Sequence, residues 1–232
     1  MMNRPKVSVV IPAFNAERFL GEAIESVLAQ SLSAAEILVV DDGSTDNTGL
    51  VAAGFPGVTV VSLAHFGVSA ARNAGVSRST GDFIAFLDAD DTWMPERLER
   101  QFVRLAASPA AGVVMARQTY RFEVPVPSWF RGPTDGSSEP GYQPSNWLVR
   151  RETWTRVGPF TEGITHSEDT DWLARASDLG VEVVMADEVL VVHRIHEQNA
   201  SGQAEAVRAG VLHALRTSVR RKQGTVPEGG LP

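Results

Sequence analysis

The 232-residue chain contains no cysteine, and no apolar run in it approaches the roughly 18 residues that a membrane-spanning helix needs. The absence of cysteine excludes disulfides, thiolate nucleophiles and cysteine-bound zinc, and it leaves the redox compartment open. The first residues, MMNRPKVSVVIPAFN, reach charged residues and Pro12 too early for a signal peptide. We therefore expect a cytoplasmic protein without a transmembrane segment.

Positive charge is also scarce, because 21 Lys and Arg face 28 Asp and Glu, which gives a formal net charge of -7. The sequence pI of about 5.3 argues against a general nucleic-acid binder, since such a protein needs a basic surface against the phosphate backbone. Phosphates bridged by a metal ion are compatible with this charge. The composition, 43% hydrophobic and 21% charged, is that of a globular protein large enough for one substantial core.

The first predicted strand is not followed by G-x-G-x-x-G, which argues against a dehydrogenase. Instead, short apolar runs alternate with amphipathic segments along the chain. This alternation is typical of βαβ units, so we predict an α/β fold with a mostly parallel sheet flanked by helices. The predicted strands are 7–11, 36–40, 58–62, 83–87, 112–115, 146–149 and a late pair at 181–186 and 189–193, and the predicted helices are 15–28 with Asn15 as its cap, 47–53, 67–76, 95–106, 151–157 and 168–179.

Two later segments differ from this pattern. Residues 124–146 are rich in Pro, Gly and Ser, and so long a loop in a compact domain is usually functional or disordered. The pattern of residues 203–222 predicts an amphipathic helix with a basic last turn. We interpret this turn as favourable to the helix dipole, in preference to a role in membrane docking. We expect one main domain at 1–202 and a small C-terminal helix and tail at 203–232.

The stretch GDFIAFLDADDTW places three carboxylates at the end of a buried strand. Asp88, Asp90 and Asp91 would lie beyond the carboxyl edge of the sheet, where open α/β sheets bind their ligands. Two such charges about 4 Å apart repel by roughly 4 kcal/mol at an effective dielectric near 20, so the cluster requires a cation. Oxygen ligands favour Mg²⁺ or Mn²⁺. Asp91 alone could cap the next helix instead, but capping explains one acid of the three.

A second acidic turn, Asp41-Asp42, follows the strand at 36–40. A carboxylate there can accept a hydrogen bond from the imide N–H of uracil or thymine, or from a guanine edge. An acidic turn that only caps a helix is an equally weighted alternative. Because both acidic turns follow strands of one predicted sheet, they can face the same crevice.

Several motifs, taken in order, resemble those of the inverting family 2 glycosyltransferases. They are VSVVIPAFN, ILVVDDGSTDNT, GVSAARNAGV, FIAFLDADDTWMPERL, LVRRETWTRVGPF, SEDTDWLARA and VVHRIHEQNAS, and they extend from residue 7 to residue 201. The resemblance implies a Rossmann-like GT-A domain at 1–202, with a nucleotide-binding half at 1–93 and an acceptor-side half at 94–202. It implies a sugar transfer, with inversion, from a UDP- or dTDP-sugar to an acceptor hydroxyl. It also implies a Mn²⁺ or Mg²⁺ cofactor and a carbohydrate or glycolipid acceptor, as in surface polysaccharide synthesis, with peripheral contact at the inner membrane face.

The resemblance also implies roles for individual residues in the donor site. Asp42 would lie at the base, Asp88 near the ribose and sugar, and Arg72 near the base or diphosphate, although an arginine at a helix start is as often a structural ion-pair partner. Asp90 and His196 would hold the metal, although a lone histidine is more often structural. The implied nucleotide-binding residues are Pro12, Ala13, Phe14, Asn15, Asp42, Arg72, Asp88 and Ala89.

The implied catalytic base is Asp169, at the start of a helix where acids can also serve only the dipole. The family commonly has an aromatic residue at the position of His193, so the role of this histidine is left open. Trp129 or Trp147 could offer an apolar face to a sugar. The residues expected to contact the diphosphate or the acceptor are Asp91, Trp147, Glu168 and Arg194.

Two other classes of protein are alternatives. A sugar-1-phosphate nucleotidylyltransferase of related fold should have a Gly-rich loop and a basic residue after the first strand, whereas this chain reads PAFNAERFL there. A non-catalytic nucleotide-sugar or carbohydrate-binding module needs no base, so substitution of Asp169 would leave its activity unchanged. We expect the transferase.

Overall fold

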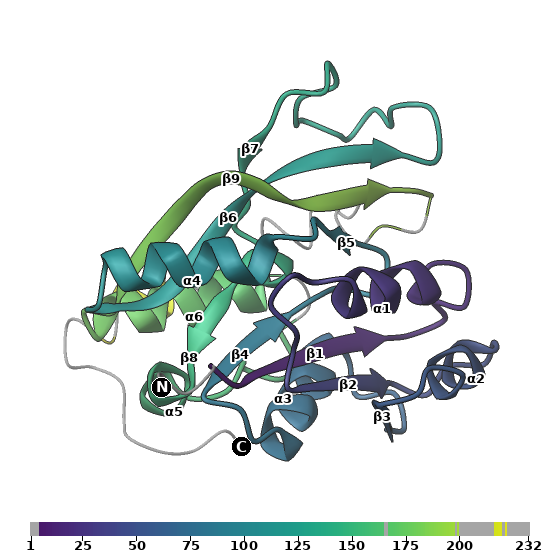
Figure 1. Cartoon of the computed structure of the whole chain (residues 1–232), viewed down its shortest axis with the longest axis horizontal. Coiled ribbons are helices and arrows are strands. Elements are labelled where there is room, and N and C mark those ends of the chain that lie inside the picture. The colour runs from purple at the N-terminus through teal and green to yellow at the C-terminus, as the bar shows by residue number, and fades with distance from the viewer. Residues whose placement is uncertain (1–4, 165–166, 198, 200–215, 220, 222–232) are drawn as a thin grey trace.

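A computed structural model describes residues 5–164, 167–197, 199, 216–219 and 221, which form one sheet with helices on both faces (Figure 1). Within these residues the sheet has nine strands in the order β3-β2-β1-β4-β8-β6-β9-β5, with β7 paired to β6. The strands are β1 (Val7–Ala13), β2 (Glu36–Asp41), β3 (Val58–Ser62), β4 (Phe83–Phe86), β5 (Thr92–Trp93), β6 (Ala111–Phe122), β7 (Glu139–Pro140), β8 (Leu148–Arg150) and β9 (Glu182–Ile195). The helices are α1 (Leu20–Leu28), α2 (Thr48–Ala53), α3 (Val68–Arg78), α4 (Arg97–Ala107), the 3₁₀ turn η1 (Pro144–Asn146), α5 (Arg151–Val157) and α6 (Glu168–Asp178).

The first four long strands are parallel, as the alternating pattern predicts. β1 pairs with β2 and β4, and β2 pairs with β3. Every residue of β1 is buried, because helices cover both faces, and this explains its continuous apolar run. The carboxyl ends of β1, β2 and β4 therefore meet at one edge, and the acidic turns follow two of them.

Alternate residues of β1 belong to two separate cores, since successive side chains of a strand point to opposite faces. Val9 packs in a core with α1, α2 and α4, to which Leu20 and Leu98 belong. Val10 packs in a second core with α3, α5 and α6, to which Trp172 belongs. The result is a three-layer α/β/α structure, and the predicted α/β class is confirmed.

The second half of the sheet is mixed. β8 is antiparallel to β4 and β6, whereas β6 and β9 are parallel and extend together beyond the other strands (Figure 1). The late strand pair predicted at 181–186 and 189–193 is wrong, because β9 is one strand. Its register against β6 shifts between Met115 and Arg117, so a bulge accommodates the polar residues that suggested a turn.

Asn15 does not cap the first helix, contrary to the prediction, because α1 begins at Leu20. Asn15 has a positive φ of 49° and joins two loops instead. Its N–H donates to Ser44 Oγ at 2.9 Å, and its Oδ1 accepts the Thr45 N–H at 2.8 Å. The residue therefore fixes the loop after β1 against the loop after β2.

Most of the predicted C-terminal helix and tail at 203–232 lie outside the described residues. Among those described, Arg221 Nε donates to Asp178 Oδ2 at 2.9 Å, so one cation of the basic turn pairs with the end of α6. No helix in the described part of the chain is both long enough and apolar enough to cross a membrane. The proposed division at 93/94 and 202/203 stays a prediction.

Substitution of Gly75 tests the packing of α3 on the sheet. A Cβ at Gly75 would lie 2.4 Å from Val10 Cγ1 and 3.1 Å from Val40 Cγ2. We predict that Gly75→Ala destabilises the protein by about 1–3 kcal/mol in urea unfolding, through overpacking. Ser77→Ala, on the exposed side of the same helix, should change stability by less than about 0.5 kcal/mol. Equal stability of the two variants would contradict this packing.

Candidate active site

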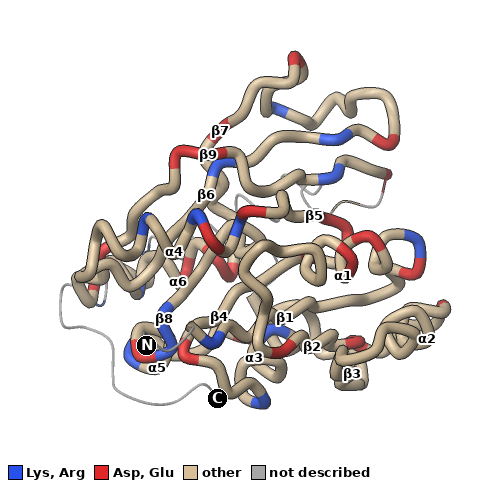
Figure 2. Tube along the Cα trace, in the orientation of Figure 1, with Lys and Arg blue, Asp and Glu red and all other residues tan. Residues whose placement is uncertain are grey.

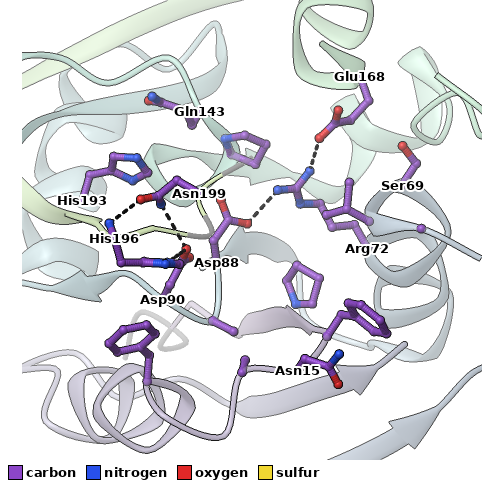
Figure 3. Close-up of a pocket in the computed structure, with 18 of the residues that line it drawn as sticks. Asn15, Ser69, Arg72, Asp88, Asp90, Gln143, Glu168, His193, His196 and Asn199 are labelled. Carbon is purple, nitrogen blue, oxygen red and sulfur yellow. Dashed lines mark hydrogen bonds and ion pairs between the residues drawn. The ribbon is translucent and has the colours of Figure 1, made fainter. Parts of the chain in front are cut away.

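A cleft of about 1290 Å³ opens at the carboxyl edge of the sheet (Figure 3). The loops after β1 and β4, the start of α3, the start of α6 and the end of β9 form its walls. It brings together most of the residues expected in the donor site, although they lie far apart in the sequence. Those that line it are Pro12, Phe14, Asn15, Arg72, Asp88, Ala89, Asp90, Glu168, Asp169 and His196.

The side chain of Arg72 connects two walls of the cleft. Its Nη2 donates to Asp88 Oδ1 at 2.6 Å and its Nη1 donates to Glu168 Oε1 at 2.5 Å (Figure 3). Burial disfavours the charge, but the two carboxylates raise the pKa of Arg72 above its ordinary value. Arg72 and Glu168 thus form a structural ion pair as well as lining the site.

Asp90 pairs with His196. The distance from His196 Nε2 to Asp90 Oδ2 is 2.9 Å, and Asn199 Nδ2 donates to the same oxygen at 3.4 Å. Burial raises the pKa of Asp90, but the hydrogen bond from His196 and the charge of His193 outweigh it, so that the pKa lies below its ordinary value. Asp90 is therefore ionised at neutral pH and carries a full charge at the cleft surface.

The pair suits a divalent cation that takes its other ligands from elsewhere. Two neighbouring ligands of an octahedral ion, with bonds of about 2.1 Å, lie about 3 Å apart. Asp90 Oδ2 and His196 Nε2 have this separation. No group of three or more His, Cys, Asp or Glu in the described part of the chain is arranged to hold a metal. Water or phosphate oxygens would have to complete the shell, as is usual for Mg²⁺.

Asp91 does not line the cleft, and its predicted contact with diphosphate or acceptor is not supported. It is 1% exposed, and its Oδ1 accepts from His193 Nδ1 at 2.8 Å and from the Arg194 N–H at 3.1 Å. Burial alone would lower the pKa of His193, but Asp91 beside it raises the pKa to about 9. Asp91 positions the end of β9, and His193 itself does line the cleft.

Arg194 is also engaged in the protein interior, which corrects the expected phosphate contact. Its Nη2 donates to Glu22 at 2.8 Å, its Nη1 donates to Glu123 at 2.9 Å, and its Nε donates to the Asp90 carbonyl at 2.8 Å. The guanidinium is 2% exposed and lies 4.6 Å from the ring centroid of Phe19. Figure 2 shows acidic segments of α1 on the side of the molecule that carries the basic ends of β6 and β9. Arg194 therefore connects the turn that carries Asp90 to α1.

Asp169 lies in the first turn of α6 and lines the cleft. Burial, and then the charge of Glu168, raise the pKa of Asp169, against the hydrogen bond from the Thr170 N–H. Its neighbours Glu168 and Asp171 are both paired, with Arg72 and Arg175 respectively. Asp169 is thus the acid in this turn that has no cationic partner among the described residues.

Two residues predicted at the nucleoside lie behind the cleft surface. Ala13 is 4% exposed and does not line the cleft. The two oxygens of Asp42 accept the N–H groups of Phe66 and Gly67 at 2.8 and 2.7 Å, so this carboxylate fixes the loop that enters α3. Phe14, 45% exposed, is instead the aromatic surface at this end of the cleft.

Trp147 cannot present a face to a sugar, contrary to the prediction. It is fully buried, and its ring centroid lies 5.3 Å from that of Trp172 and 6.1 Å from that of Phe160. Trp129 lies against Phe130 and does not line the cleft. From the segment 124–146, only Val124 and the turn at 143–144 reach it.

The residues that hold the loop at Asp88–Asp91 in place were not predicted from the sequence. The Asp88 N–H donates to Ser145 Oγ at 3.0 Å, and the carbonyl of Ser145 accepts from Arg97 Nη2 at 3.0 Å. Arg97 is fully buried and lies 3.7 Å from the ring centroid of Trp93. Nothing in the local sequence marks Ser145 or Arg97, but Asn199 lies inside a quoted motif and could have been included.

Comparison with known proteins supports this fold. The chain belongs to glycosyl transferase family 2, whose profile matches residues 8–160. S. aureus TarS 1-349, determined in complex with UDP-GlcNAc, has a similar fold, with a TM-score of 0.75 at 21% identity over 92% of this chain and 65% of that one. Mannosyltransferase PcManGT from Pyrobaculum calidifontis, in complex with GDP-Man and Mn²⁺, gives a TM-score of 0.74 at 19% identity over 100% of this chain and 67% of that one. The predicted GT-A fold is confirmed.

One curated relative is the Escherichia coli UDP-Glc:alpha-D-GlcNAc-diphosphoundecaprenol beta-1,3-glucosyltransferase WfgD, which is 40% identical over 41% of this chain and 39% of its own length. Two further curated relatives are matched over 35% and 48% of their lengths. The chain therefore spans less than half the length of these relatives.

Removal of the Arg72 side chain tests its role between the two walls. Arg72→Met would leave Asp88 and Glu168 without their cation, so we predict a loss of about 3–5 kcal/mol in urea unfolding. Arg78→Met, at the exposed end of the same helix, should cost less than about 0.5 kcal/mol. If both variants were as stable as the unmodified protein, the bridge would have no structural role.

Proposed function

We propose that the protein is a metal-dependent inverting glycosyltransferase that moves a sugar from a nucleotide-diphosphate donor to an acceptor hydroxyl. The observation that carries this proposal is the juxtaposition, in one cleft, of the Asp90–His196 pair with Asp169. The Asp90–His196 pair suits a cation that would bind the diphosphate of a donor. Asp169 is a carboxylate without a cationic partner among the described residues, and it comes from a different wall of the cleft.

In this proposal Asp169 is the general base. Inversion by a single displacement needs a carboxylate on the face opposite the leaving diphosphate, within hydrogen-bond reach of the acceptor hydroxyl. Asp169 lies on α6, whereas Asp88 and Asp90 follow β4, so the two groups approach the sugar position from different elements. Its raised pKa makes it a stronger proton acceptor than an ordinary aspartate.

Asp90 and His196 would hold the divalent cation together with diphosphate oxygens. When bound, such an ion neutralises the charge that develops on the leaving nucleoside diphosphate. Asp88, positioned by Arg72 and by the Ser145 hydroxyl, would face the ribose and sugar. Phe14 and Asn15 would contact the nucleoside from the loop after β1, with Asp42 fixing the opposite loop.

The donor is proposed to be a UDP- or dTDP-sugar, and the acceptor a carbohydrate or glycolipid of surface polysaccharide or glycoconjugate synthesis. One glycosyltransferase relative is a UDP-Glc-dependent glucosyltransferase, one structural neighbour was determined with UDP-GlcNAc, and another was determined with GDP-Man and Mn²⁺. The same relative acts on a diphosphoundecaprenol-linked sugar. A cytoplasmic site, with peripheral contact at the inner membrane face, would suit such an acceptor.

Ligand-linked stability tests the metal part of the proposal. At 100 times its dissociation constant, UDP should stabilise the fold by about 2.7 kcal/mol when Mn²⁺ is present, and much less in excess EDTA. Asp90→Asn should remove most of the metal-dependent part, whereas Asp187→Asn, an exposed site on β9, should keep it. Equal stabilisation by UDP with and without Mn²⁺ would overturn metal dependence.

Substitution of Asp169 tests the assignment of the base. We predict that Asp169→Asn lowers the transfer rate by about 10² to 10⁴ while the UDP affinity measured by calorimetry stays unchanged. Glu152→Gln, an exposed acid in the first turn of α5, is the control and should retain full activity. Near-normal turnover of Asp169→Asn would reject this base and move the role to Glu168 or Asp171, and lost UDP affinity would place Asp169 in the donor site.

The pH profile gives a second test of the same residue. Because the base must be ionised and its pKa is raised by burial and by Glu168, the rate should fall with decreasing pH earlier than an ordinary aspartate would cause. The measurement is kcat/KM against pH with Mn²⁺ saturating. An acid limb at the ordinary aspartate pKa would contradict the buried environment of Asp169.

A further inference from the structure

His193 presents one ring nitrogen to the cleft. Its Nδ1 lies 2.8 Å from Asp91 Oδ1, and the Asp91 carboxylate is itself held by the Arg194 N–H. The ring also packs edge-on against Tyr120, with centroids 5.8 Å apart. Orientation of the imidazole is therefore fixed from two sides. The other nitrogen, Nε2, has no hydrogen-bond partner among the described residues, although the side chain lines the cleft.

The other basic side chains that line the cleft in the described part of the chain each lie against a carboxylate. Arg18 lies 3.7 Å from Glu123, Arg72 pairs with Asp88 and Glu168, and His196 pairs with Asp90. The guanidinium of Arg194, the next residue of β9, pairs with Glu22 and Glu123. Asp88, Asp90 and Asp91 all lie close enough to raise the pKa of this histidine. An anionic group placed here would meet more carboxylates than cations.

A hydroxyl group suits Nε2 better than a phosphate does. With Nδ1 committed to Asp91, Nε2 accepts a hydrogen bond when the ring is neutral and donates one when the ring is charged. A hydroxyl can donate and accept, so it satisfies either form, whereas an ionised phosphate oxygen only accepts. Gln143, which also lines the cleft, carries a neutral amide, whereas the amide of Asn199 is already bonded to Asp90, Arg194 and His196.

We infer that His193, held by Asp91, is a specificity-determining residue of the acceptor subsite, where its Nε2 hydrogen-bonds a hydroxyl of an uncharged sugar unit of the acceptor. The inference rests on the proposed transferase function, because it needs an acceptor beside the donor cleft. It gives a role to a residue at which this chain departs from the aromatic that the family commonly has. Asp91 and Tyr120 act through His193 as positioning residues.

Two substitutions of His193 separate its two nitrogens. In His193→Asn the side-chain amide can replace Nδ1 at Asp91 but nothing replaces Nε2, whereas in His193→Gln the amide can replace Nε2 but the contact with Asp91 is lost. Asp187→Asn is the matched control, because it changes an exposed carboxylate of the same strand, β9, that does not line the cleft. Thermal unfolding reports whether each variant is folded.

The experiment measures binding of methyl glucoside, methyl galactoside and methyl N-acetylglucosaminide to the full chain by saturation-transfer NMR, with UDP and Mn²⁺ present. We expect His193→Asn to weaken glycoside binding about tenfold, and His193→Gln to remain within about threefold of the unmodified protein. UDP affinity should stay unchanged in both variants, and Asp187→Asn should bind glycosides normally.

The outcomes distinguish this inference from the proposed function. If the unmodified protein binds UDP with Mn²⁺ but binds no methyl glycoside, or if His193→Asn binds glycosides as well as the unmodified protein, the acceptor subsite is wrong and the transferase proposal stands. Binding of methyl phosphate in place of glycosides, lost in His193→Asn, would also overturn the inference in favour of an anionic group. If the unmodified protein does not bind UDP, the proposed function itself fails.

Discussion

The buried guanidinium of Arg72 is the interaction on which the cleft depends. It is 3% exposed and lies between Asp88, on the loop after β4, and Glu168, at the start of α6. A buried cation is stable only when its carboxylates are ionised and well placed, since removal of one partner leaves an uncompensated charge. The two walls that would face a donor and an acceptor are therefore set at a fixed separation by one side chain of a third element, α3.

The same rule explains how so many acids share one sheet edge. Asp88 pairs with Arg72, Asp90 with His196, and Asp91 with His193. Each of the three carboxylates after β4 thus has its own partner. One partner comes from α3, and the other two come from the end of β9 and the residues after it. Asp169, in contrast, has a carboxylate as its neighbour in the turn, which together with burial raises its pKa. Differences in pairing, and not in residue type, separate the binding acids from the proposed base.

Much of the fold could be predicted, because apolar runs and helical periodicity report burial directly, and the carboxyl ends of parallel strands must meet. The same argument places Asp88 and Asp90 at the cleft, and the family resemblance adds His196 and Asp169. Pattern alone could not tell that Trp147 and Arg194 are buried, since an aromatic or a cation can face either the core or a cleft. The continuity of β9 through its bulge depends on pairing with β6, which is a long-range contact that local polarity conceals.

The central claim is that this cleft binds a nucleoside diphosphate through a metal held by Asp90 and His196, beside a preformed Arg72 bridge. The most direct measurement is anomalous scattering at the manganese edge from crystals grown with UDP and Mn²⁺. The account predicts one strong peak in contact with Asp90 Oδ2, His196 Nε2 and the diphosphate, with the Arg72 contacts to Asp88 and Glu168 retained. A manganese peak away from Asp90, or UDP bound in the cleft without any metal, would contradict it.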